Sequence, residues 1–240
     1  MLLELKSVSK RFGAVVAADG VDLVVSQGEA LGIIGANGAG KSSLFNLITG
    51  VLRPDAGIVE FRGNEITRSS VRERCRGGIG RSFQIPQPFE TLTVFENLMV
   101  SAEFGVADKA VGVEETFAIL EMTDLADKAN VVSGKLTLLD RKRLELARAL
   151  ATNPDLLLLD EIAGGLTEAE CLKLVELIRT LHQRGITIIW IEHIVHALLS
   201  VVSRLIVLER GKLIAEGEPQ AVMADPAVRR SYLGIEEAAS

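Results

Sequence analysis

The sequence predicts an α/β fold in which helices cover a parallel sheet, an antiparallel β layer lies beside it, and a helical lobe is inserted. Three observations predict it. Short apolar runs alternate with helical patterns, the first strand patterns have no helices between them, and strand patterns vanish from about residue 86 to residue 150. Strands that are buried on both faces are continuous apolar runs, and their alternation with helices is typical of parallel sheets.

The parallel core is predicted from apolar runs and helical periodicity. The expected strands cover residues 30–34, 155–159 and 186–191, and the expected helices cover residues 41–49 and 168–184. Leu174, Ile178 and Leu181 recur at helical spacing, so they should line a buried helix face. Gly50 and Gly185 follow the two helices, and glycine commonly ends a helix.

The remaining segments depart from this alternation. The antiparallel layer is expected from strand patterns at residues 2–25 and 58–63. The helical lobe is expected from patterns at residues 93–104, 114–122 and 138–150, and the tail from short strands at 205–217 followed by two small helices. With 240 residues, 48% of them hydrophobic, the chain can form one large domain. We therefore expect a single domain over residues 1–240, with the core and β layer in 1–85 and 151–240 and the helical subdomain at about 86–150.

Composition limits the partners. The 26 lysines and arginines against 32 aspartates and glutamates give a net charge of −6, which argues against nucleic acid as a main partner. Cys75 and Cys171 match no metal spacing and are expected to be reduced thiols of a cytosolic protein. We expect no signal peptide and no spanning helix, because the most apolar stretch, 186–208, carries Glu192 and Arg204. Any membrane association should come through a partner.

Residues 35–42, Gly-Ala-Asn-Gly-Ala-Gly-Lys-Ser, satisfy G-x-x-x-x-G-K-[ST] between a strand and a helix. Glycines let backbone N–H groups curl around phosphate oxygens, and the helix N-terminus adds its dipole. Lys41 is expected to contact the β and γ phosphates, and Ser42 to offer its hydroxyl to Mg²⁺. The predicted phosphate ligands are Gly35, Ala36, Asn37, Gly38, Ala39, Gly40, Lys41 and Ser42. The motif therefore predicts a P-loop NTPase.

Two acids follow the apolar strand Leu156–Leu159. Carboxylates at the carboxyl edge of a parallel sheet lie where ligands bind. Asp160 is placed to orient Mg²⁺, and Glu161 to polarise the water that attacks the γ-phosphate. Alone, the string is equally compatible with a solvated strand end. Its pairing with the phosphate loop favours the functional interpretation.

Two further side chains are candidates for the same edge. His193 follows the strand at 186–191, and a histidine there is more often structural, but it can reach the γ-phosphate from this edge. Gln84 follows a short strand and opens the helical insert, where it could ligate Mg²⁺ or water. His182 and His196 are not expected to take part.

Together these segments resemble the nucleotide-binding subunit of an ATP-binding-cassette (ABC) transporter over about residues 3–234. The resemblance implies an ATPase that uses ATP and Mg²⁺. By position it implies the following residues: Phe12 stacked on adenine, Gly35 to Ser43 as Walker A, Gln84 as the Q-loop residue, Asp160 and Glu161 as Walker B, and His193 as the switch histidine.

The family's signature loop, Leu-Ser-Gly-Gly-Gln, is replaced here by Leu136, Thr137, Leu138, Leu139 and Asp140. In the family this loop contacts the ATP that is bound to the other subunit. Leu138 and Leu139 keep their N–H groups but add side chains where a close approach is needed, and Asp140 adds a negative charge unless residues 141–143 screen it. Two interpretations stay open: a heterodimer with one slow site, or leucines that pack inward and leave both sites working.

Two other positions depart from the family. Ile162 stands where many relatives have proline, and Thr167 stands where the D-loop, here 165–167, usually has Asp or Asn.

A groove for a permease helix is expected near residues 84–96, with contacts from Phe89 and also from Pro86 and Pro88. Ordinary packing within the lobe is an equal alternative for these residues.

A narrower resemblance, to the branched-chain amino-acid importer ATPases, covers residues 78–84, 92–98, 214–217 and 231–234. It implies a second ATPase subunit, membrane permease subunits, an extracytoplasmic binding protein acting indirectly, and a peripheral location at the cytoplasmic face of the inner or plasma membrane. The nearest alternative is an exporter or lipid-extracting transporter. A non-transport ABC ATPase is disfavoured by the single cassette and the acidic charge, and a module without hydrolysis by the complete set of site residues.

Overall fold

The computed structural model describes residues 1–105 and 111–233, so Gly234 of the narrower resemblance lies outside the described residues. The strands are β1 (Leu3–Phe12), β2 (Val15–Val25), β3 (Ala30–Ile34), β4 (Ala56–Phe61), β5 (Asn64–Glu65), β6 (Ile79–Arg81), β7 (Leu156–Asp160), β8 (Thr187–Ile191), β9 (Arg204–Glu209) and β10 (Lys212–Gly217). The α-helices are α1 (Lys41–Thr49), α2 (Val71–Arg76), α3 (Val94–Glu103), α4 (Val113–Met122), α5 (Leu138–Ala151), α6 (Glu168–Gln183), α7 (Val195–Leu199), α8 (Pro219–Ala224) and α9 (Pro226–Leu233). Two 3₁₀ turns, η2 (Ala126–Lys128) and η3 (Ser133–Lys135), precede α5.

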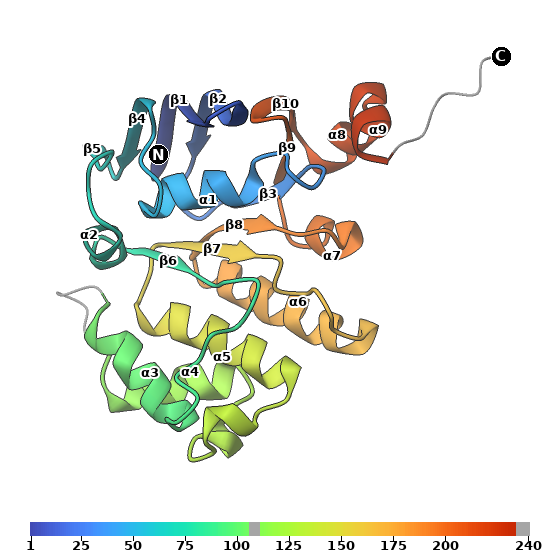
Figure 1. Ribbon diagram of the computed structural model, residues 1–240. Coiled ribbons are helices and arrows are strands. Elements are labelled where there is room, and N and C mark those ends of the chain that lie inside the picture. The colour runs from blue at the N-terminus through green and yellow to red at the C-terminus, as the bar shows by residue number, and fades with distance from the viewer. Residues whose placement is uncertain (106–110, 234–240) are drawn as a thin grey trace.

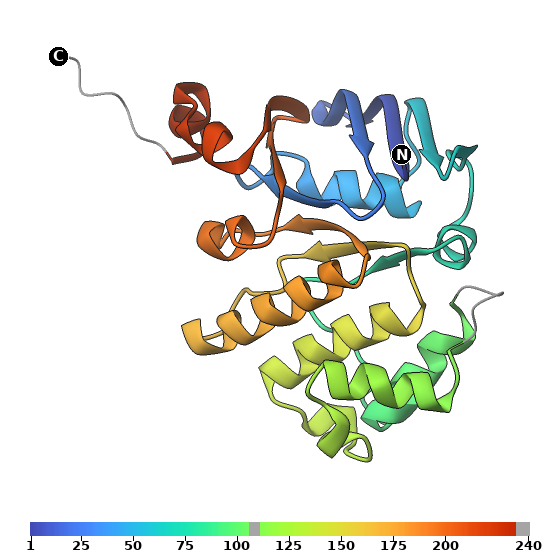
Figure 2. The ribbon, with the colours of Figure 1, turned by 180° about the vertical axis from the view of Figure 1, so that it is seen from behind.

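The central sheet has the strand order β10-β9-β3-β8-β7-β6. Every neighbouring pair from β9 to β6 is parallel, and β10 pairs antiparallel with β9 at one edge. Helix α1 lies on one face of this sheet, and α5 and α6 lie on the other (Figures 1 and 2). The parallel order brings the carboxyl ends of β3, β6, β7 and β8 to one edge, where the predicted site residues follow their strands.

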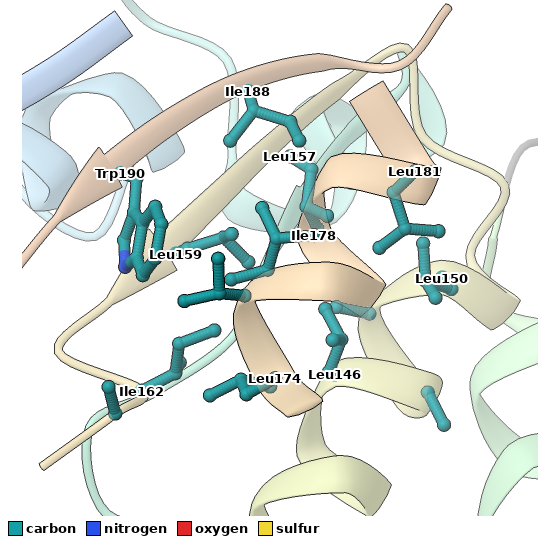
Figure 3. Close-up of a cluster of buried hydrophobic side chains, with 14 of the residues drawn as sticks. Leu146, Leu150, Leu157, Leu159, Ile162, Leu174, Ile178, Leu181, Ile188 and Trp190 are labelled. Carbon is teal, nitrogen blue, oxygen red and sulfur yellow. The ribbon is translucent and has the colours of Figure 1, made fainter. Parts of the chain in front are cut away.

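Side chains of the central strands alternate between two hydrophobic clusters. Leu159 and Trp190 pack in the cluster that contains Ile178 of α6 (Figure 3). Leu158 and Ile189 point to the opposite face, in the cluster shared with α1 and the β layer. Because both faces are buried, the strands are continuous apolar runs, as the sequence predicted.

The antiparallel layer has the order β2-β1-β4-β5. Leu3 and Leu5 of β1 and Val59 of β4 share a buried cluster with Phe45 of α1. Helix α1 therefore lies between the two sheets (Figure 1). This arrangement fixes α1, and the phosphate loop at its N-terminus, from both sides.

Helices α3, α4 and α5 come between β6 and β7 in the chain and pack on one another below the central sheet (Figure 1). The rings of Phe95 in α3 and Phe117 in α4 have centroids 5.1 Å apart. Thr93 begins α3 with a capping box to Glu96. Among the described residues, no helix has the length and apolar character that a membrane crossing requires.

Helix α2 was not expected from the apolar pattern. Ser70 begins it with a capping box to Glu73, a sequence signal that was available. Its Arg74 is buried and donates to the carbonyls of Leu47 (2.7 Å) and Ile48 (2.9 Å). The guanidinium thus satisfies carbonyl groups near the C-terminus of α1 that a helix leaves without partners.

Candidate active site

The phosphate loop connects β3 to α1. Gly35 and Gly40 have φ values of +156° and +108°, which side chains rarely adopt. A Cβ at Gly35 would lie 2.3 Å from the carbonyl oxygen of Leu208, and one at Gly40 would lie 2.3 Å from that of Ala17. Both positions therefore require glycine, because the loop is pressed against neighbouring backbone on either side.

Lys41 begins α1 and turns its side chain back over the loop. Its Nζ donates to the carbonyl oxygens of Gly35 at 2.7 Å and Ala36 at 3.1 Å. Burial lowers the pKa of Lys41, and the negative charges of Glu161 and Asp160 oppose that shift. The ammonium group therefore lies in the loop and within electrostatic reach of both predicted acids.

A cavity of about 270 Å³ opens at the loop. It is lined by Phe12, Val15, Val16, Ala17, Asn37, Gly38, Ala39, Gly40, Lys41, Ser42, Ser43 and Glu161. The ring of Phe12 is 47% exposed, with Nζ of Lys10 5.6 Å from its centroid. The structure thus brings the phosphate loop, Glu161 and the aromatic residue expected at adenine to one cavity.

Glu161 contacts two of the other predicted residues. Nε2 of Gln84 donates to its Oε2 at 2.6 Å, and Nε2 of His193 lies 2.8 Å from its Oε1. The backbone of Glu161 has φ +47°, a left-handed conformation that is uncommon outside glycine and concentrated at functional sites. Its N–H donates to the carbonyl of Ile191 at 2.9 Å, which ties the turn after β7 to β8.

Asp160 is buried at the end of β7. Its Oδ2 accepts a hydrogen bond from Nη2 of Arg81 at 2.7 Å, and Nη1 of Arg81 donates to Oδ1 of Asn46 at 2.6 Å. The sequence indicated neither partner. Arg81 lies three residues before Gln84 in the chain. Its contact with Asp160 depends on the direction of its side chain, which the sequence does not give.

The three predicted metal ligands, Ser42, Gln84 and Asp160, offer a hydroxyl, an amide and a carboxylate. Mg²⁺ commonly binds proteins through one or two such oxygens and takes its other ligands from phosphates and water. Ser42 lines the cavity, while the amide nitrogen of Gln84 is engaged by Glu161. No group of three or more histidine, cysteine or acidic side chains in the described residues could hold a metal. The donor set therefore fits a Mg²⁺ ion that arrives with a polyphosphate.

Glu192 is a further residue of this edge whose role sequence reasoning missed. It is 1% exposed, and its carboxylate accepts hydrogen bonds from the N–H groups of His193 (2.9 Å) and Ala163 (3.1 Å). These bonds fix the turn that carries His193 against the turn that follows Glu161. A charged residue that directly continues an apolar strand was the available signal.

The segment Leu136–Asp140 forms the N-terminus of α5. Thr137 is the N-cap: its Oγ1 accepts a hydrogen bond from the N–H of Asp140 at 3.2 Å and donates to Oδ2 of Asp140 at 2.8 Å. Leu138 is 49% exposed and Leu139 is half-buried, whereas Leu136 is buried. None of these residues lines the phosphate-loop cavity.

The expected environment of Asp140 needs a correction. Asp140 is only 4% exposed, and Nζ of Lys128 at 2.9 Å and Nη1 of Arg143 at 3.6 Å pair with its carboxylate. Burial opposes its ionisation, but hydrogen bonds from Lys128 and Thr137 outweigh that cost and hold the pKa of Asp140 below its usual value. Arg143 was foreseen as a screening charge, but Lys128, twelve residues upstream, was not.

The two other departures take local structural roles. Ile162 is 2% exposed in the cluster around Trp190. Thr167 caps α6 in a capping box with Glu170. Threonine, like Asp and Asn, is a favoured N-cap residue, so it preserves the start of α6.

Comparison with known proteins identifies the family. The family described as ABC transporter matches residues 18–164, and the family described as branched-chain amino acid ATP-binding cassette transporter matches residues 212–238. A probable branched-chain amino acid transport ATP-binding protein of Methanocaldococcus jannaschii is 35% identical over 97% of this chain and 97% of its own length. A lipopolysaccharide export system ATP-binding protein of Acidithiobacillus ferridurans is 34% identical over 97% of each chain.

A solved structure agrees with the fold. The crystal structure of the ADP conformation of an ATP-binding cassette of an ABC transporter superposes with a TM-score of 0.88 and 34% sequence identity, over 98% of this chain and 99% of that one. This likeness confirms the predicted fold class, an α/β P-loop NTPase core of the ABC type. With a family match over more than half of its length, this chain belongs to the ABC transporter family and is an ATP-binding subunit with ATPase activity.

Proposed function

We propose that this chain powers an importer for branched-chain or related amino acids. The observation that carries this proposal is the match of residues 212–238, which cover β10, α8 and α9, to the branched-chain amino acid cassette family. This segment lies outside the 18–164 match that ABC transporters of many kinds share. The alternative is export of a lipid. It is supported by the 34% identity to the lipopolysaccharide export subunit.

Hydrolysis follows from the contacts of Glu161. Its carboxylate takes a proton from a water molecule as that water attacks the γ-phosphorus, and the bond to the β,γ-bridging oxygen breaks to release ADP. Gln84 and His193 each hold one carboxylate oxygen, so the group is oriented before ATP arrives. Lys41 and the N–H groups of the phosphate loop stabilise charge on the phosphoryl oxygens. Phe12 stacks on the adenine ring at the open end of the same cavity.

Ser42, Asp160 and Gln84 would hold Mg²⁺ together with the phosphates. When bound, the ion neutralises charge on the β and γ phosphate oxygens. The contact between Gln84 and Glu161 gives the glutamine a second partner in the same site. Its nitrogen holds the carboxylate, so the amide oxygen would be the atom that it offers to the ion.

A second ATPase subunit completes the site. The segment Leu136–Asp140 lies away from this chain's own cavity, which supports a contact with ATP bound to the partner. If the partner has a standard signature loop, the two sites differ. The exposed Leu138 then obstructs close approach at the partner's ATP, and loss of one well-placed donor slows such a step by about 10²–10³-fold.

The asymmetry is tested by replacing each catalytic glutamate in turn in the assembled transporter. We expect Glu161→Gln to abolish most ATP turnover, because this chain's phosphate loop serves the faster site. The equivalent change in the partner should remove only a small part of the turnover. Equal losses would show that the two sites contribute alike.

The permease contact is proposed at the junction of the core and the helical lobe. A cavity of about 200 Å³ there is lined by Val51, Val71, Phe83, Glu145 and Arg148, among others. Phe89 is 46% exposed beneath the guanidinium of Arg148, 5.1 Å from its ring centroid, and does not line the cavity. The expected contact near residues 84–96 therefore shifts toward Phe83, and Pro86 and Pro88 also lie outside the cavity lining.

Through this contact the subunit sits peripherally at the cytoplasmic face of the membrane, and a binding protein on the other side delivers the cargo. Vesicles that contain the whole transporter, with its binding protein, test both direction and cargo. Amino-acid uptake that requires ATP on the side of this subunit supports import of leucine, isoleucine or valine. ATP-driven removal of lipid from the vesicle, without amino-acid uptake, would favour the export alternative.

A further inference from the structure

Arg81, the last residue of β6, connects three parts of the nucleotide site. Nη2 donates to Oδ2 of Asp160 at 2.7 Å, and Nη1 donates to Oδ1 of Asn46 in α1 at 2.6 Å. Residue 81 pairs in the sheet with Leu158, which fixes its backbone beside β7. The phosphate-loop helix, the Walker B strand and the strand that leads to Gln84 are thus linked by one side chain.

Two aromatic rings lie close to the guanidinium of Arg81. Its Cζ lies 4.8 Å from the ring centroid of Phe83 and 5.5 Å from that of Phe45. The side chain is 9% exposed and that of Asp160 is 7% exposed. Nε is buried without a hydrogen-bond partner among the described residues, so the two terminal nitrogens make the polar contacts. The guanidinium is a rigid planar fork, so its two hydrogen bonds, to Asp160 and Asn46, fix the plane of the group.

The contact with Arg81 uses one oxygen of the Asp160 carboxylate. In the part of the chain that the structure describes, Oδ1 of Asp160 accepts no hydrogen bond, while Oδ2 is held by Arg81. A carboxylate that is fixed through one oxygen presents the other in a defined direction. Partners behind a metal-site carboxylate orient it in this way and change metal affinity when they are removed.

We propose that Arg81 is a positioning residue that sets the orientation of Asp160 toward the Mg²⁺ of bound ATP. This inference rests on the proposed role of Asp160 at the metal. Because Asn46 of α1 and Phe83, next to Gln84, contact the same guanidinium, Arg81 also keeps the phosphate loop and the Q-loop in register with Asp160. A lysine in its place keeps the charge but loses the two-pronged geometry.

The test measures binding of a fluorescent ATP analogue to the purified protein at increasing Mg²⁺, and also without Mg²⁺. We expect Arg81→Lys to raise the Mg²⁺ concentration for half-maximal binding by about 10–100-fold. Binding without Mg²⁺ should stay within about twofold. Arg72→Met, which changes an exposed arginine of α2, should alter neither value. An unchanged Mg²⁺ requirement in Arg81→Lys would overturn the inference.

A double-mutant cycle tests whether Arg81 acts through Asp160. Arg81→Met alone leaves Asp160 buried without its partner and can unfold the protein, whereas Arg81→Met combined with Asp160→Asn removes both charges. If Arg81 acts through Asp160, the Arg81 change has no further effect on the Mg²⁺ requirement in the Asp160→Asn background. An equal further effect there overturns the inference. If Asp160→Asn alone leaves the Mg²⁺ requirement unchanged, the proposed metal role of Asp160 fails, and the inference fails with it.

Discussion

At the scale of single residues, the Glu161 carboxylate is held by two side chains that arrive on neighbouring strands. Gln84 follows β6 and His193 follows β8, on either side of β7. The carboxylate is therefore oriented by two side chains that come from different strands of the sheet. If Glu161 is the general base, as proposed, loss of either partner lets its carboxylate sample unproductive directions.

We expect Gln84→Ala and His193→Ala each to lower ATP turnover by about 100-fold, the size of effect produced by a misplacement of about 1 Å. In a Glu161→Gln background, neither change should lower turnover further, because the base itself is gone. Steady-state phosphate release measures both. His196→Ala, which changes an exposed histidine of α7, is the matched control and should leave ATP turnover unchanged. Full additivity of the losses would contradict a shared role.

The residues that follow strands could be predicted because a parallel sheet brings its carboxyl ends together whatever the side-chain details are. Arg81 and Glu192 could not be assigned roles this way. Their roles depend on where a long or charged side chain turns after the backbone is set, and that direction is decided by tertiary neighbours such as Asn46 and Ala163. Spacing along the chain carries no information on such contacts.

At the scale of elements, α5 begins with a side-chain cap at Thr137. Thr137 and Asp140 bond each other in both directions, and Lys128 from the η2 turn pairs with the buried carboxylate. The helix itself was predicted within a residue from its periodicity. The pairing with Lys128 was not, because it requires the intervening segment to fold back onto the start of α5.

Asp140→Asn should lower the free energy of unfolding by about 1.5–3 kcal/mol at neutral pH, the usual range for hydrogen bonds to charged groups. Because the folded-state pKa of Asp140 is depressed, its stabilisation is complete above the unfolded value, about 3.9, and is lost as pH falls through the folded value. The difference between wild type and variant should therefore be constant from pH 7 to about pH 5 and shrink below the unfolded pKa.

Urea unfolding at a series of pH values measures this difference. Asp127→Asn, which replaces an exposed acid of the same η2 turn, serves as the control and should change stability little. A difference that grows on acidification would show that Asp140 is destabilising in its ionised form.

At the scale of the whole molecule, two sheets enclose α1, and the helical lobe lies on the opposite side of the central sheet (Figure 1). The apolar periodicity was sufficient to predict these layers, because burial on both faces leaves a strong pattern. Apolar periodicity did not predict the short helix α2, because its six residues are mostly polar. The layers hold the phosphate loop, Asp160 and Glu161 at one edge, where ATP can reach them from the open side of the cavity.

The central claim is that Glu161 is the base that activates water at this edge. Its most direct test compares ATP binding with single-turnover hydrolysis in Glu161→Gln, with Glu121→Gln, an exposed acid of α4, as the control. The structure predicts that Glu161→Gln binds ATP with wild-type affinity and hydrolyses it at least about 10²-fold more slowly. Hydrolysis at the wild-type rate in Glu161→Gln would contradict the claim.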